Sequence, residues 1–202
     1  MKKIVLLALL SLLNAQSFAQ KKKASAHKNT TEASSSSGTT PLAKADNLTV
    51  VLKNGTFQVT VAAKEDAEAA IVIKTVDATF KPLECKLTAF KSNGASLYSL
   101  TWVEKSASKT DTKSEDIVSK CTSILEIPTK KIVFSNTETT NHIIEKVFLD
   151  KGKNASETQE KLRREGYQCV LNTDGSILLK NKTSEKTLVY DAAKATYVPK
   201  KK

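Results

Sequence analysis

Apolar and polar residues alternate along most of the chain beyond about position 46, and this alternation is typical of strands that bury one face. The clearest case is the stretch NLTVVLKNGTFQVTVA, where Asn54-Gly55 is a two-residue hairpin signal. With these two residues as the loop, three apolar residues of one strand face three of the other: Leu52 faces Phe57, Val50 faces Val59, and Leu48 faces Val61. The register and the alternation agree, so we expect a hairpin with one buried face.

A second Asn-Gly pair predicts another hairpin in ECKLTAFKSNGASLYSLTWVE. A tight turn at Asn93-Gly94 again places apolar residues on a shared face: Ala89 faces Tyr98, Leu87 faces Leu100, and Cys85 faces Trp102. Trp102 is therefore expected in the core. The alternative is an exposed row of Tyr98 and Trp102 that binds carbohydrate.

Further strands follow from the same pattern. TSILEIP and KIVFS form a strand pair around Pro128-Thr129, and the β-branched residues of NHIIEKVFL favour a strand. Asp174-Gly175 predicts a third tight hairpin, and KTLVY adds another antiparallel strand.

One segment, near 155–165, predicts a short surface helix. Ser156 is an N-cap with Gln159 three residues later, Arg163 and Arg164 lie near the end, and Gly166 would terminate the helix. The apolar stripe is thin, so the helix would lie over one edge of the sheet.

These elements predict a mainly β fold: an antiparallel sheet, either a sandwich or a curved meander, with one short helix. The single β-rich domain would span residues 46–198, a length sufficient for a real core. Long β segments with few helices argue against a nucleotide-binding α/β fold.

The residues before this domain have a different composition. Residues 1–19 combine Lys2 and Lys3 with an apolar run too short to span a bilayer, which is the pattern of a secretory signal peptide. Small residues at the −3 and −1 positions place cleavage between Ala19 and Gln20. Residues 20–45 are rich in Ser, Thr and Lys and predict a disordered linker. We expect an exported protein, periplasmic or extracellular, that is soluble and has no transmembrane segment after signal removal.

The net charge of +11 invites a nucleic-acid interpretation, but its distribution weakens that interpretation. Residues 46–198 carry only +2, and most of the excess lies in the leader, the linker and the basic tail 199–202. The candidate contacts for a polyanion or an anionic membrane surface are six lysines: Lys21, Lys22, Lys23, Lys200, Lys201 and Lys202. We expect no specific nucleic-acid partner.

The three cysteines, Cys85, Cys121 and Cys169, include no CxxC pair, which excludes the common redox and zinc-ribbon motifs. Each is in phase with apolar neighbours, so buried thiols are expected. The alternative is one disulfide and a free thiol.

Catalytic chemistry finds little support. A Cys–His pair would need His142 beside Cys121 or Cys169, and no motif indicates this. Two groups of carboxylates could in principle form a hydrolase site. They are Glu65, Asp66 and Glu68 in one loop and Asp111, Glu115 and Asp116 in another. We expect no cofactor and no metal.

The sequence therefore favours a small exported protein of non-enzymatic type that binds an envelope component or a protein partner. Two alternatives remain: a hydrolase that uses loop carboxylates or a Cys/His pair, and a protein that binds polyanions or membrane surfaces through its lysine-rich tails.

Overall fold

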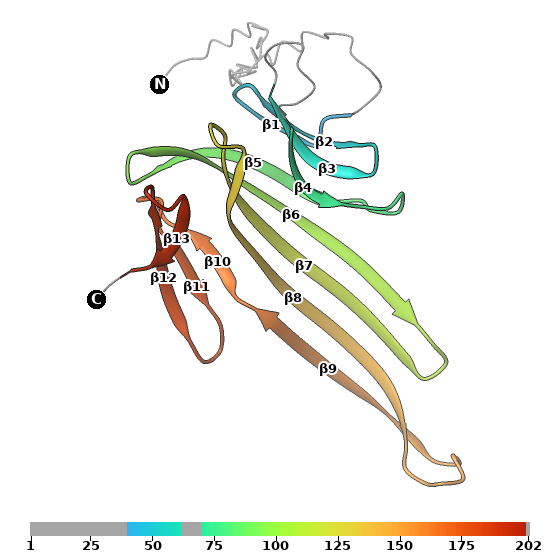
Figure 1. Cartoon of the computed structure of the whole chain (residues 1–202). Coiled ribbons are helices and arrows are strands. Elements are labelled where there is room, and N and C mark those ends of the chain that lie inside the picture. The colour runs from blue at the N-terminus through green and yellow to red at the C-terminus, as the bar shows by residue number, and fades with distance from the viewer. Residues whose placement is uncertain (1–39, 62–69, 201–202) are drawn as a thin grey trace, which may run out of the picture. The chain divides into compact units, whose positions relative to one another are not determined.

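The computed structural model describes residues 40–61 and 70–200, which lie within one compact unit, Ser37–Lys202. The described residues form strands and connecting loops and contain no helix (Figure 1). The fold is mainly β, as the alternation predicts, and consists of three antiparallel sheets. In each sheet the strands follow one another in chain order, so each sheet is a meander.

The three sheets are called A, B and C in chain order. Sheet A contains β1 (Ala43–Ala45), β2 (Leu48–Lys53), β3 (Thr56–Val61) and β4 (Ile71–Thr75). Sheet B contains β5 (Leu83–Ser92), β6 (Ala95–Lys109), β7 (Lys113–Glu126), β8 (Lys131–Phe148) and β9 (Ser156–Gly166). Sheet C contains β10 (Gln168–Leu171), β11 (Ile177–Lys180), β12 (Glu185–Asp191) and β13 (Thr196–Pro199).

The first predicted hairpin is confirmed in its register. Leu52 pairs with Phe57, and the pairs Val50–Val59 and Leu48–Val61 follow. Asn54 and Gly55 both have positive φ, 50° and 69°, as a type I′ turn requires.

The second hairpin is confirmed up to a bulge. Asn93 and Gly94 form the turn between β5 and β6, and Ala89–Tyr98 and Leu87–Leu100 pair as predicted. The register then shifts between Leu83 and Lys86, so Cys85 does not pair with Trp102. Glu84 has a positive φ of 52° within this bulge, a local feature that alternation cannot indicate.

The other predicted strands are present. TSILEIP and KIVFS belong to β7 and β8, NHIIEKVFL continues β8, and KTLVY lies in β12. Asp174-Gly175 does lie between β10 and β11. The first pair beside it is Leu171–Ile177, so the loop is longer than a two-residue turn.

The predicted helix near 155–165 is wrong, because these residues form β9. Every residue of β9 from Ser156 to Gly166 pairs with β8. A helix here would have had almost no apolar face to bury, whereas the backbone of β8 offers a complete ladder of hydrogen bonds. Tertiary pairing therefore overrides the local capping signals.

Sheet B takes part in two separate hydrophobic cores because alternate residues of its strands face opposite sides. On one side, Leu100 and Trp102 pack with sheet A residues such as Phe57. On the other side, Leu97 and Ile124 pack with sheet C residues such as Ile177.

Part of sheet B extends beyond both cores (Figure 1). We call this part the projecting end: residues 104–109 of β6, 113–119 of β7, 139–148 of β8 and 156–165 of β9. None of these residues belongs to either core, and the ion pair of Glu104 with Lys74 of β4 lies at the border with sheet A.

The start of the folded part differs from the predicted boundary at residue 46. The last residues of the predicted linker, Ala43–Ala45, form β1 and pair with β2. Leu42 and Ala43 also pack against the core shared with sheet A. The predicted signal peptide and the rest of the linker up to residue 39 lie outside the described residues.

Candidate binding groove

The three cysteines occupy different surroundings, and all are free thiols. Cys121 is buried beneath sheet A, whereas Cys85 and Cys169 are half-buried at the edges of the two cores. Burial raises the pKa of each thiol, and that of Cys169 rises to about 11. A thiol of raised pKa is a poor nucleophile near neutral pH.

His142 does not meet either candidate cysteine. Its imidazole Nε2 lies 2.6 Å from a carboxylate oxygen of Glu160, its neighbour on β9. Across the sheet His142 pairs with Asp116, five positions along β7 from Cys121 and of opposite parity, so the two side chains project from opposite faces. It lies four positions along β8 from Glu138, which borders Cys169, a separation of roughly 13 Å at strand spacing. The structure brings no Cys–His pair together.

The second carboxylate group is divided between two faces of sheet B. Glu115 accepts a hydrogen bond from Asn141 and forms an ion pair with Lys113, and both interactions lower the pKa of its carboxyl group. Asp116 is the next residue of the strand and projects from the other face, and Asp111 lies in the turn before β7. Glu65, Asp66 and Glu68 lie outside the described residues.

Trp102 is a core residue, as predicted. It is 6% exposed, and its ring meets that of Phe57 edge-on at 5.2 Å between centroids. Its indole Nε1 donates to Glu104, which also forms an ion pair with Lys74. The Cys121 thiol lies 3.9 Å from the same carboxylate. Glu104 thus provides a hydrogen-bond acceptor for the Trp102 indole and the Cys121 thiol at the edge of the core beneath sheet A.

Of the six predicted tail lysines, only Lys200 is described. Its backbone N–H donates to Thr187 at 2.9 Å, which extends the pairing of β13 with β12 by one residue, and its side chain is exposed. Lys21, Lys22, Lys23, Lys201 and Lys202 lie outside the described residues, as do Ala19 and Gln20.

The residues that do converge form a groove where sheet C begins, which we call the Glu138 groove. Its floor is made of two cross-strand rows on the face of sheet B that also contacts sheet C. The rows are Thr101–Thr122–Asn136 and Val103–Lys120–Glu138, placed side by side by the pairing of β6, β7 and β8. Glu138 borders two adjoining cavities, of about 240 and 360 Å³.

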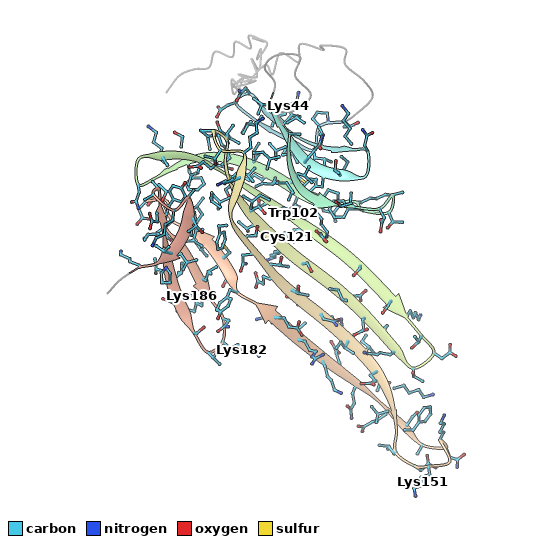
Figure 2. The ribbon with its side chains drawn as sticks, viewed as in Figure 1. Lys44, Trp102, Cys121, Lys151, Lys182 and Lys186 are labelled. Atoms are coloured by element: carbon cyan, nitrogen blue, oxygen red, sulfur yellow. The ribbon has the colours of Figure 1, made fainter. Side chains whose placement is uncertain are left out.

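The walls come from the end of β9, from β10 and from the β11–β12 turn. Gln168 and Cys169 begin sheet C, and Gly166 pairs with Glu138 at the point where the chain leaves sheet B. The opposite wall is the turn Lys180–Thr183 (Figure 2 labels Lys182). The Asn181 side chain accepts the backbone N–H groups of Thr183 and Ser184 at 3.0 and 2.8 Å, which holds this turn.

The groove is polar and carries both signs of charge. Four cationic side chains line it: Lys120, Arg164, Lys180 and Lys182. Three carboxylates also line it: Glu84, Glu138 and Glu165. Hydroxyl and amide groups of Thr101, Thr122, Asn136, Gln168 and Thr183 add neutral donors and acceptors. This set offers both donors and acceptors to a ligand with many hydroxyl groups.

Within the described residues, no group of three or more His, Cys, Asp and Glu side chains is placed to hold a metal ion. The same part of the chain contains no helix of the length and apolarity needed to cross a membrane. Comparison of the chain with protein-family models, with curated proteins and with solved structures gives no match.

Sequence reasoning missed the groove. Its polar floor residues alternate with core residues such as Trp102 and Cys121 and therefore look like an ordinary solvent face. The available signal was the polar residues at alternate positions of β7 and β8, Lys120 and Thr122 in one strand and Asn136 and Glu138 in the other, with Thr101 in β6. Only the register of β6, β7 and β8 shows that these residues line up across the strands as two neighbouring rows.

Proposed function

We propose that this protein is an exported, non-enzymatic binding protein that holds a saccharide of the cell envelope in the Glu138 groove. The observation that carries the proposal is the groove itself. Five of the six floor residues are polar, the exception being Val103, and charged groups of both signs line the groove. Saccharide hydroxyls donate and accept hydrogen bonds, and such a surface offers both kinds of partner.

Export is part of the proposal and rests on residues 1–19. Cell fractionation and N-terminal sequencing of the native protein test it. The expected result is a mature protein outside the cytoplasm that begins at Gln20. A cytoplasmic protein that keeps Met1 would contradict export and would leave the proposed saccharide binding in the groove unaffected.

The binding test is isothermal titration calorimetry with soluble oligosaccharides released from the envelope. Arg164→Ala and Lys182→Ala each remove a charged donor from the groove rim, and both side chains are exposed, so the fold should persist. Each variant should bind about tenfold more weakly, the loss expected for a hydrogen bond from a charged group.

The matched control is Lys105→Ala, an exposed lysine of β6 that does not line the groove. Its affinity should equal that of the wild type. The oligosaccharide recovered after incubation should be unchanged in length. Cleaved product would favour a hydrolase instead, and equal affinity of all three variants would exclude the groove as the site.

A further inference from the structure

The β8–β9 hairpin ends in a turn that combines apolar side chains with lysines. We call residues Lys146–Ala155 the apex. Leu149 is 62% exposed, more than any other large apolar side chain of the described residues. Transfer of such a side chain from water into an apolar environment is favourable.

The apex contains three exposed lysines in addition to the leucine: Lys146, Lys151 and Lys153. The Nζ atoms of Lys146 and Lys153 each lie 5.4 Å from the centroid of the Phe148 ring. Both ammonium groups therefore form cation–π contacts with this ring, and both lysines are exposed to solvent. No described residue forms an ion pair with any of the three lysines.

The only acid of the apex has a structural role in the turn. Asp150 Oδ1 accepts the backbone N–H of Ala155 at 3.1 Å, and the backbone N–H of Leu149 donates to Ala155 at 3.0 Å. Three lysines against one aspartate leave the apex with a formal charge of +2. The apex thus combines an exposed leucine with a net positive charge.

We propose that the apex binds the surface of a lipid bilayer that carries anionic head groups. Leu149 and Phe148 would enter the boundary between head groups and acyl chains, and the three lysines would contact the phosphates. A bilayer is favoured over an acidic protein because the apex is the end of a hairpin and not a groove (Figure 1). A fluid surface can receive such an end directly, whereas a protein partner would need a pocket built for Leu149.

This inference goes beyond the proposed function and does not rest on it. The apex and the Glu138 groove lie at different places in the fold, as the labels of Lys151 and Lys182 show in Figure 2. Failure of saccharide binding would leave the apex proposal intact, and failure of vesicle binding would leave the groove proposal intact.

The test is co-sedimentation of the full chain with vesicles of phosphatidylcholine, with and without phosphatidylglycerol. All variants keep the lysine-rich ends, so those ends contribute equally. Leu149→Ser should weaken binding to the anionic vesicles about tenfold, since the leucine no longer enters the interface. Replacement of Lys146, Lys151 and Lys153 by Gln should weaken it about fivefold for each lysine, the equivalent of ~1 kcal/mol.

Two matched controls use equally exposed positions. Leu162→Ser changes another exposed leucine, on β9. The second control is a triple variant that removes the same charge from exposed strand positions outside the apex: Lys91→Gln, Lys105→Gln and Lys109→Gln. Both controls should bind nearly as well as the wild type, and thermal unfolding should show that all variants fold.

Three results would overturn the proposal. The apex and control variants could lose binding equally, which would assign it to overall charge or to the lysine-rich ends. Vesicles of phosphatidylcholine alone could bind as well as anionic ones. The chain could bind neither vesicle but associate with an acidic protein through the apex, which would make the partner a protein.

Discussion

At the scale of single residues, burial decides what the three thiols can do. Cys121 is 7% exposed, and its neighbour Thr137 donates a hydrogen bond to its sulfur at 3.8 Å. Cys169 is half-buried and packs against the core shared with sheet C, and this burial raises its pKa to about 11. The alternation predicts buried thiols at all three positions; Cys121 is buried, whereas Cys85 and Cys169 are half-buried. A buried thiol behaves as a small apolar side chain.

We therefore predict slow alkylation of the native protein. At pH 8 iodoacetamide should react with all three thiols far more slowly than in urea, because the reactive thiolate is scarce and shielded. The Cys169 rate should keep rising as the pH approaches about 11, the pKa at which half of its thiol is ionised. Mass spectrometry of labelled peptides measures each site. Rapid labelling of Cys169 at pH 7 would contradict the burial described.

At the scale of elements, the junction between β9 and β10 is the most constrained point. Gly166 has a positive φ of 81°, and a Cβ at this position would lie 2.1 Å from the carbonyl oxygen of Thr137. The sequence pattern predicts that Gly166 terminates an element, and it does. The element is a strand, and a glycine is required there because the backbone of β8 passes so close.

Gly166→Ala should be clearly more destabilising than Gly94→Ala. Gly94 has nearly the same φ, 80°, but a Cβ there would meet no atom within 4 Å beyond its chain neighbours. Its alanine variant therefore suffers only left-handed strain of about 1–2 kcal/mol. Gly166→Ala adds a clash with backbone that must move. The free energy of unfolding in urea measures both. Equal decreases in the free energy of unfolding would mean that the backbone of β8 at Thr137 can move aside at little cost.

At the scale of the described unit, sheet B serves two cores through its opposite faces. Ile71 packs in the core with sheet A, and Ile177 packs in the core with sheet C. A sheet between two apolar layers needs apolar residues on both faces, and this explains why adjacent residues such as Ile124 and Leu125 are both fully buried. The projecting end also has adjacent apolar residues, such as Ile143 and Ile144, but neither belongs to one of the two cores, and Ile144 is 39% exposed.

Substitutions in the two cores should be additive. Ile71→Val and Ile177→Val should each cost about 0.5–1.5 kcal/mol of unfolding free energy, and the double variant should equal their sum within about 0.5 kcal/mol. The reference pair is Phe57→Leu with Trp102→Phe, whose rings are in contact and should couple. Urea denaturation measures all of these variants. Strong coupling between Ile71 and Ile177 would mean that the two cores respond as one.

The sequence by itself determined the class of fold, the turns at Asn54-Gly55 and Asn93-Gly94, and the burial of Trp102. These features follow from local alternation and from the positive φ that the turn residues tolerate. Tertiary structure decided the rest. β9 is a strand because β8 offers a full ladder of partners, and Cys85 leaves the register because of a bulge. The groove and the apex exist only once register and hairpin length have placed distant polar and apolar residues together. Such placement depends on contacts between segments far apart in the chain, and the local pattern of apolar and polar residues does not specify which segments pair.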